Sequence, residues 1–296
     1  MSKPAYIILN GMLIQESEAR ISPLNRGLMY GDGCFETFRS YAGKFLGWEL
    51  HFERLSDGLD YLEIQAPFSS TELKSQVLQV LEKNDLTEKE AMIRFQCWRV
   101  GERGYATSSR KMNWLIQSSE IQSKKTPLRL LLAKTRCIPS VALDRKYKLS
   151  NGLNYIKAAQ EAMNAGCDDS LMLTINNKIS ETTVANLFWI KEGKIFTPSV
   201  KCDLLPGVTR ELVIQVMNRA DIELEVGEFE WSDLKQAETL FCTNSLIEIL
   251  EVASISQLMG ERGDSANEII NFNTDHSKLK KLKNAFQEFK IEEMST

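Results

Sequence analysis

Hydrophobic residues along the first 118 positions follow two periods, one typical of strands and the other typical of helices. Two short apolar runs, 6–9 and 12–15, flank Asn10-Gly11, a dipeptide favoured in the tight turn of a β-hairpin. Apolar residues then recur at helical spacing from Trp48, which predicts an amphipathic helix. The further elements expected here are a helix over 72–83 and strands over 92–99 and 112–117.

The second half of the chain repeats this mixture of short strands and helices. A strand is expected over 128–133 and a helix over 153–165, and two hairpins follow, turning at Asn176-Asn177 and Glu192-Gly193. Pro206-Gly207 then opens a helix at Val208. The C-terminal helix is expected to bury one apolar face, made of Leu279, Leu282, Phe286 and Phe289.

The polar run 119–127 has few large apolar residues and is expected to link two domains. It separates a small N-terminal domain, 1–118, from a larger domain, 128–296. A chain of 296 residues also exceeds the size at which single cores usually stop growing. Strands interspersed with helices in both halves predict an α/β (α+β) architecture with a ligand cleft between the domains.

Composition and charge exclude several functions. The net charge is −4 and the basic residues are scattered, so nucleic acid is not an expected partner. The 6 cysteines are far apart and form no C-x-x-C pair, which argues against a metal site and against a disulfide framework. Because the N-terminal apolar run is too short for a signal peptide and no run is long enough to span a membrane, we expect a cytoplasmic protein.

Three lysines in or just before the helix expected at 153–165 are candidate reactive amines: Lys146, Lys148 and Lys157. In that helix Leu153, Ile156, Ala159 and Met163 are expected to form the buried face, which leaves Lys157 on the solvent side. Lys146 and Lys148 would point the same way on an extended segment, so periodicity does not separate them.

Three segments together resemble the class IV aminotransferase family, the fold-type IV pyridoxal 5'-phosphate (PLP) enzymes. They are KYKLSNGLNYIKAAQEA, the E-x-x-x-x-N-L-F pattern from Glu181 to Phe188, and LLPGVTRELVIQVM. The family includes branched-chain and D-amino-acid aminotransferases and 4-amino-4-deoxychorismate lyase, and the resemblance covers nearly the whole chain. It implies a smaller N-terminal α/β domain and a larger C-terminal domain with a mixed sheet or barrel-like core.

The resemblance also implies roles for single residues. Counting back from Gly166 makes Lys148 the amine that forms the Schiff base with PLP, and Glu181 becomes the carboxylate that keeps the pyridine nitrogen protonated. The phosphate is expected to be held by an arginine, helix N-terminal amides and polar side chains of one loop. These residues are Arg54, Val208, Thr209, Asn244 and Ser245. His51 falls on the apolar helix face and is expected in the core.

The motifs that set the reaction point in two directions. Thr37, the R-G-Y run that contains Arg103 and Tyr105, and the T-N-S-L run at 243–246 are similar to the lyases. In contrast, Tyr30 and Phe35 are similar to the branched-chain enzymes, and Arg94 stands where the lyases commonly have lysine. The R-x-H carboxylate trap of D-amino-acid aminotransferases is missing.

The expected function is therefore 4-amino-4-deoxychorismate lyase, which forms 4-aminobenzoate and pyruvate for folate biosynthesis. Transfer of amino groups from branched-chain or D-amino acids is the alternative, and a non-catalytic binding protein of the same fold is a remote one. Arg94 and Arg103 are expected to hold carboxylates of a small amino or keto acid, with Tyr30, Phe35 and Tyr105 beside them and Thr37 near the reactive face of PLP. The resemblance also implies a homodimer.

Overall fold

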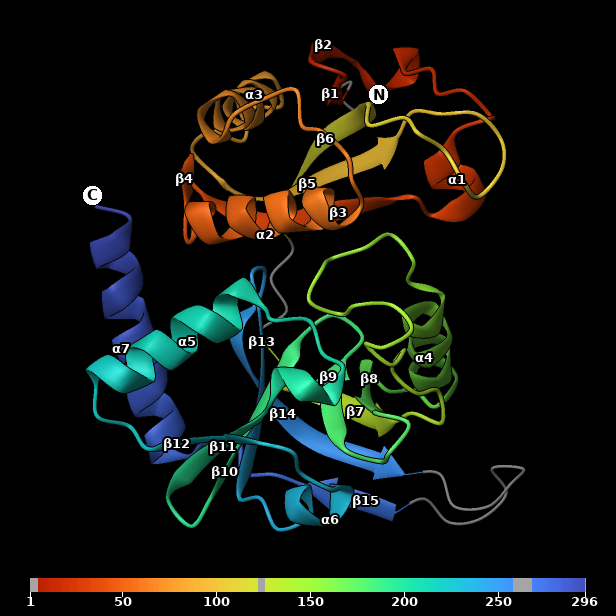
Figure 1. Ribbon diagram of the computed structural model, residues 1–296. Coiled ribbons are helices and arrows are strands. Elements are labelled where there is room, and N and C mark those ends of the chain that lie inside the picture. Colours follow the sequence, from red (N-terminus) through yellow and green to blue (C-terminus); the bar gives the residue numbers. More distant parts are fainter. Residues whose placement is uncertain (1–4, 122–125, 258–267, 296) are drawn as a thin grey trace. The chain divides into compact units, whose positions relative to one another are not determined.

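The computed structural model describes residues 5–121, 126–257 and 268–295 (Figure 1). They divide into two compact units, which we call the first and the second unit. The first unit contains the chain up to Gln122 and also Tyr147–Asn151, and the second contains the remainder. The linker expected at 119–127 lies partly outside the described residues, and its beginning, up to Glu120, is the end of a strand.

Within the described residues, the first unit is built on a six-stranded antiparallel sheet of order β2-β1-β6-β5-β3-β4. Its strands are β1 (Tyr6–Leu9), β2 (Met12–Gln15), β3 (Gly33–Tyr41), β4 (Lys44–Phe45), β5 (Glu90–Arg99) and β6 (Met112–Glu120). The helices are α1 (Arg26–Tyr30), α2 (Trp48–Tyr61) and α3 (Ser70–Lys83). The hairpin at Asn10-Gly11 and the helix from Trp48 are confirmed, and α2 buries Leu55 and Leu59 as expected.

Tyr147–Asn151 adds a short extended segment to the free side of β3 at its beginning. Phe35 N donates to Lys148 O at 3.0 Å, and Ser150 N donates to Gly33 O at 2.9 Å. Cys34 and Leu149 pair as an antiparallel bridge. A segment from the middle of the sequence, more than a hundred positions away from β3, is therefore part of the first unit.

The second unit contains a nine-stranded mixed sheet, counted over the described residues. Its strand order is β12-β11-β10-β13-β14-β7-β8-β9, with β15 paired to β14. The sheet curls, because β9 lies beside β10, and Leu130, Leu171, Leu187 and Trp189 fill the core. This arrangement confirms the predicted barrel-like mixed sheet. The strands are β7 (Leu128–Leu132), β8 (Asp169–Leu173), β9 (Ile179–Thr182), β10 (Asn186–Lys191), β11 (Lys194–Pro198), β12 (Leu224–Gly227), β13 (Thr239–Asn244), β14 (Glu248–Gln257) and β15 (Glu268–Asn271).

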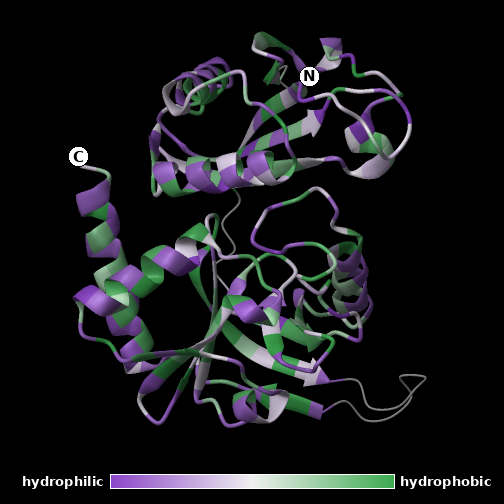
Figure 2. Cartoon of the chain, in the orientation of Figure 1, coloured by the Kyte–Doolittle hydropathy of each residue, from purple (hydrophilic) through white to green (hydrophobic). Residues whose placement is uncertain are grey.

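Helices cover this sheet. They are α4 (Leu153–Asn164), α5 (Val208–Arg219), α6 (Trp231–Leu234) and α7 (Ser277–Glu293). The C-terminal helix α7 buries the four predicted residues, and Figure 2 shows its hydrophilic and hydrophobic residues side by side along the helix. No helix of the described residues is long and apolar enough to cross a membrane.

The buried face predicted for α4 is wrong. Leu153, Ile156 and Met163 are 70%, 57% and 68% exposed, whereas Ala158 and Ala162 are buried. The helix lies close against the sheet, since Ser170 Oγ on β8 donates to Ala158 O at 2.7 Å. Small side chains permit this close approach, so they take the inner positions that the larger residues were expected to occupy.

Candidate active site

In the first unit, one face of the sheet collects four of the predicted site residues. Phe35 and Thr37 share a face of β3 because side chains alternate along a strand, and Arg94 on β5 is paired with Thr37. The Lys148 ammonium lies 4.6 Å from the centroid of the Phe35 ring, and the Arg94 guanidinium lies 4.1 Å from it. Two cations therefore share one aromatic ring at this face.

Burial separates the candidate lysines. Lys148 is half-buried, whereas Lys146 and Lys157 are exposed. A desolvated amine is the better candidate for bond formation and proton transfer, because a surface ammonium is held charged by water. The geometry of the first unit thus supports the choice of Lys148.

Hydrogen bonds fix the arginine of this face. Arg94 Nη2 donates to Gln96 Oε1 at 2.9 Å, and Gln96 Nε2 donates to Ser150 Oγ at 2.8 Å. Burial lowers the pKa of Arg94 below its ordinary value. Ser150 therefore orients Arg94 through Gln96, and Ser150 belongs to the same short segment, Tyr147–Asn151, as Lys148.

The opposite face of β3 holds a buried charge cluster of Glu36, His51 and Arg54. Arg54 donates to both carboxylate oxygens of Glu36 at 2.7 Å, and His51 Nδ1 lies 2.9 Å from Glu36 Oε2. Burial alone would raise the pKa of Glu36, but the Arg54 charge and the His51 hydrogen bond outweigh it and lower the pKa to about 2. His51 is buried, as expected, and burial lowers its pKa. Arg54, predicted to hold phosphate, is thus oriented by Glu36.

In the second unit, Glu181 on β9 is surrounded by hydrogen-bond donors. Tyr155 Oη donates to Oε1 at 2.6 Å, and the Leu205 amide donates to Oε2 at 3.1 Å. Asn186 Nδ2 lies 3.4 Å from Oε2 and also donates to Leu205 O at 2.8 Å. Glu181 is only 4% exposed, so these contacts hold a carboxylate in the interior at the edge of the barrel-like sheet.

The motifs alone did not indicate Arg145 and Tyr155, which extend this network. Arg145 Nη2 donates to Tyr155 Oη, and the guanidinium lies 5.0 Å from the Tyr155 ring centroid. Burial and the Glu181 charge raise the pKa of Tyr155, which keeps its hydroxyl protonated as a donor. A signal was present: Tyr155, Ala158 and Ala162 recur at helical spacing on the inner face of α4.

The start of α5 lies beside this network. Its N-cap is Gly207, which has no side chain to accept from the first amides of the helix, including those of Val208 and Thr209. Thr209 Oγ1 lies 3.4 Å from Ser245 Oγ. Two hydroxyl groups are therefore found close to each other at the N-terminus of α5, where the first helical amides also lie. Asn186 contacts both Glu181 and the start of α5. Its Oδ1 is so close to Gly207 that a Cβ added there would lie only 2.1 Å away.

The side chain of Asn244, a residue expected at the phosphate, makes hydrogen bonds within its own turn and to Val184. Its Oδ1 accepts from the amides of Leu246 and Ile247, both at 2.9 Å, and its Nδ2 donates to Val184 O at 3.1 Å. These bonds shape the turn that presents Ser245. Asn244 therefore supports the turn, and the polar atoms of its side chain are used within the protein.

Tyr30 on α1 contacts the segment between β5 and β6, which carries Arg103 and Tyr105. Gly104 N donates to Tyr30 Oη at 3.0 Å, and the Tyr30 and Tyr105 rings are 5.3 Å apart. Asn151 Nδ2 donates to Tyr30 O at 3.2 Å, which ties α1 to the segment that carries Lys148.

Comparisons with known proteins agree on the family. The family model described as amino-transferase class IV matches residues 33–255. The aminodeoxychorismate lyase of Bacillus subtilis is 30% identical over 257 residues, which cover 85% of this chain and 87% of the relative. A Methanocaldococcus jannaschii protein, whose name assigns it provisionally to the branched-chain-amino-acid aminotransferases, is 32% identical over 256 residues, covering 84% and 87%.

The fold agrees as well. The branched-chain aminotransferase of Thermoproteus uzoniensis, solved with norvaline, has a TM-score of 0.88 at 22% identity and covers 98% of this chain and 96% of that one. The architecture is thus fold-type IV. The chain is an enzyme of the class IV aminotransferase family, whose members depend on PLP.

Proposed function

We propose that this enzyme binds PLP through Lys148 and acts as a 4-amino-4-deoxychorismate lyase, releasing 4-aminobenzoate and pyruvate. The observation that carries the proposal is the face of the first unit on which Lys148, Arg94 and Thr37 gather around Phe35. This face combines the amine of Lys148, the guanidinium of Arg94, which can bind a carboxylate, and the hydroxyl of Thr37, a residue shared with the lyases.

The residues fit the cofactor. PLP has an aldehyde, a ring nitrogen and a phosphate, and the chain offers an amine at Lys148, a carboxylate at Glu181 and helix N-terminal amides at Val208 and Thr209. Buried donors also lack acceptors among the described residues: Nε and Nη1 of Arg145 and the hydroxyl of Thr243. Such donors suit an anionic ligand in the second unit, since unsatisfied buried polar groups are costly.

Each residue would have one task. Glu181 would pair with the ring nitrogen, while Tyr155 and Arg145 hold that carboxylate in place. The hydroxyls of Thr209 and Ser245 would donate hydrogen bonds to the phosphate, together with the N-terminal amides of α5. Arg54, which Glu36 orients, would add a positive charge. Arg94 and Arg103 would bind substrate carboxylates.

Bound PLP withdraws electrons from the substrate and so stabilises negative charge at its Cα. Lys148 Nζ is the base that removes the Cα proton. In the lyase, the C–O bond to the enolpyruvyl group must then break, and the proton removed from Cα is redelivered to this departing group, which leaves as pyruvate while 4-aminobenzoate remains. Arg94 and Thr37 would decide the outcome by orienting the substrate relative to Lys148.

Branched-chain aminotransfer is the second candidate, because the Methanocaldococcus relative is as similar to this chain as the Bacillus lyase is. Phe35 and Tyr30 also suit an aliphatic substrate. D-amino-acid transfer has less support, since the R-x-H carboxylate trap is missing.

Product analysis tests the proposal. The purified enzyme, saturated with PLP, is incubated with aminodeoxychorismate, and separately with glutamate, alanine and branched-chain amino acids in both enantiomers. Rapid release of 4-aminobenzoate and pyruvate with slow amino transfer is expected. Fast amino transfer from an ordinary amino acid without aminobenzoate would instead identify an aminotransferase.

Covalent labelling tests the attachment site. Borohydride reduction of the yellow holoenzyme followed by peptide mapping should locate the pyridoxyl group on Lys148. A label on Lys146 or Lys157 would overturn the assignment. Lys148→Ala should abolish labelling, whereas Lys157→Ala, at an exposed position on α4, should leave it intact.

A further inference from the structure

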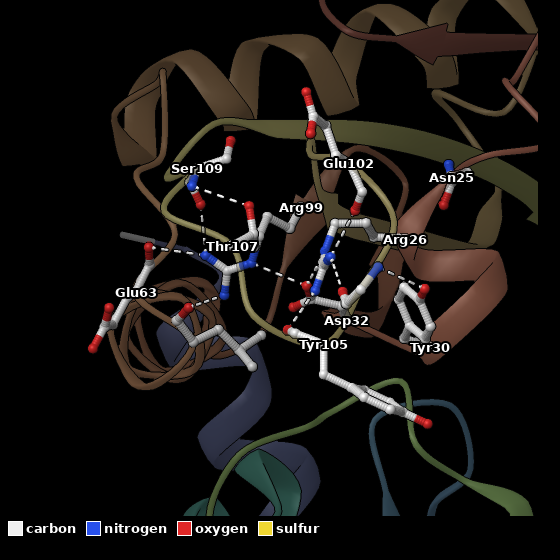
Figure 3. A network of polar contacts seen from close by, with 12 residues as sticks. Asn25, Arg26, Tyr30, Asp32, Glu63, Arg99, Glu102, Tyr105, Thr107 and Ser109 are labelled. Carbon is white, nitrogen blue, oxygen red and sulfur yellow. Dashed lines mark hydrogen bonds and ion pairs between the residues drawn. The ribbon is translucent and has the colours of Figure 1, made fainter.

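Two arginines tie down the segment 100–111, which joins β5 to β6 and carries Arg103 and Tyr105 (Figure 3). Arg26 on α1 reaches three of its carbonyls. Arg26 Nη1 donates to Glu102 O at 2.9 Å and to Gly104 O at 2.6 Å, and Nη2 donates to Tyr105 O at 3.0 Å. The carbonyls on both sides of Arg103 are therefore held by one guanidinium.

A single carboxylate orients both arginines. Asp32 Oδ2 accepts from Arg26 Nε at 2.7 Å and from Arg99 Nε at 3.0 Å. Arg99 Nη1 in turn donates to Ser109 O at 2.8 Å, near the other end of the segment. Arg26 is 3% exposed and Asp32 13%, so water competes little with these charged contacts.

We infer that Arg26, Asp32 and Arg99 are positioning residues that hold the segment 100–111 in one conformation and thereby set the direction of Arg103 and Tyr105. This inference rests on the proposed function, in which those two side chains bind substrate. The three residues act through the backbone of the segment. We call them the arginine clamp.

The clamp leaves the working side chains exposed while it fixes their backbone. Tyr105 is 90% exposed although its carbonyl is bound by Arg26. Gly104, between the two side chains, has a φ of +111°, which L side chains rarely adopt, and its amide donates to Tyr30 Oη. Without the clamp, a connection of this length would sample many conformations, and Arg103 would bind a carboxylate less tightly.

Arginine is required because its fork carries several donors in one plane. Arg26 uses Nε for Asp32 and its two terminal nitrogens for three carbonyls. A lysine keeps the charge but concentrates its donors at one atom, so it cannot span these acceptors. Arg26→Lys therefore separates the geometry of the clamp from its charge.

The first experiment measures the segment itself, in the full-length protein saturated with PLP. Trypsin cleavage after Arg103 and amide hydrogen exchange over 102–109 should both be about tenfold faster in Arg26→Lys, because cleavage and exchange require local opening. The matched control is Arg20→Lys, an exposed arginine that also donates to backbone carbonyls, of Ser17 and Ala19. Equal rates in Arg26→Lys and the wild-type protein would overturn the inference.

The second experiment uses kinetics and a variant outside the core. Gly104→Ala meets no atom within 4 Å, so it strains only the backbone conformation at φ +111°. Gly104→Ala and Arg26→Lys should each raise KM for aminodeoxychorismate about tenfold, with little change in kcat and in PLP absorbance, as expected for lost substrate positioning. A changed kcat with unchanged KM would overturn the inference. If Arg26→Lys does not fold, Gly104→Ala carries both measurements.

The two proposals can fail separately. If the wild-type enzyme does not turn over aminodeoxychorismate, the lyase assignment is wrong, and the kinetic test is made with the amino acid that the product analysis identifies. Faster exchange with an unchanged KM for the true substrate would mean that the clamp orders the segment without positioning the substrate.

Discussion

At the scale of single residues, Glu36 makes the first unit sensitive to acid. Its pKa is lowered from 4.5 to about 2 in the folded protein, so it stabilises the fold fully above pH 4.5 and loses this contribution as the pH falls toward 2. His51 acts in the same direction, because its folded pKa is also lowered, from 6.5.

We expect the free energy of unfolding to fall by on the order of 3 kcal/mol more in the wild-type protein than in Glu36→Gln between pH 5 and 2. Urea titration at several pH values measures this difference. Glu53→Gln, at an exposed position on α2, the helix that carries His51 and Arg54, is the control and should follow the wild-type curve. Parallel curves for Glu36→Gln and the wild-type protein would contradict the assignment of the buried charge.

Tyr155 is the second residue whose effect can be measured. Tyr155→Phe removes the hydroxyl between Arg145 and Glu181, at 2.6 Å from the carboxylate. Because a hydrogen bond to a charged group contributes about 1.5–3 kcal/mol, PLP affinity should fall roughly tenfold or more. Absorbance titration of the apoenzyme with PLP measures it, with Tyr61→Phe in the first unit as the control. Unchanged affinity would show that Glu181 needs no such support.

At the scale of elements, the approach of α5 to β10 depends on one missing side chain. Gly207 has an ordinary φ of −70°, so Gly207→Ala introduces no backbone strain, but its Cβ would collide with Asn186 Oδ1. Displacing Asn186 disturbs its contacts with Glu181 and Leu205, so both the melting temperature and PLP affinity should fall.

Gly152 offers a matched control for that variant. It is the N-cap of α4, also has a negative φ, and an added Cβ would meet Tyr155 only at an ordinary 3.8 Å. Gly152→Ala should therefore change the melting temperature and PLP affinity little. Equal losses in the two variants would mean that the loss of glycine at a helix N-cap, rather than the collision with Asn186, is responsible.

At the scale of the whole molecule, exposed apolar side chains support the proposed homodimer. Leu153, Ile156 and Met163 form an exposed apolar face on α4, and Leu28 is 75% exposed on α1. Monomeric proteins rarely leave such faces uncovered. Sedimentation should show a dimer, and Ile156→Glu should weaken it without unfolding α4, because the side chain is exposed. An active wild-type monomer would refute the proposal.

The sequence alone determined much of the local structure. The hairpin at Asn10-Gly11, the helix from Trp48 and the buried face of α7 follow from turn chemistry and periodicity, which depend on neighbouring residues. No element was predicted for the stretch that begins at Gly33, and it forms the long strand β3, which exchanges hydrogen bonds with β5 and Tyr147–Asn151. The motifs also indicated the family, which the comparisons confirm.

Only the tertiary structure decided which distant groups meet. Periodicity left Lys146 and Lys148 equivalent, but pairing with β3 brings Lys148 over Phe35 and leaves Lys146 exposed. Packing likewise decided the partnership of Arg145 with Tyr155 and the inner positions of Ala158 and Ala162, although these two alanines and Tyr155 recur at helical spacing. The physical reason is that periodicity reports which side of an element is apolar, whereas burial of a charge or of a small residue depends on the segment that packs against it.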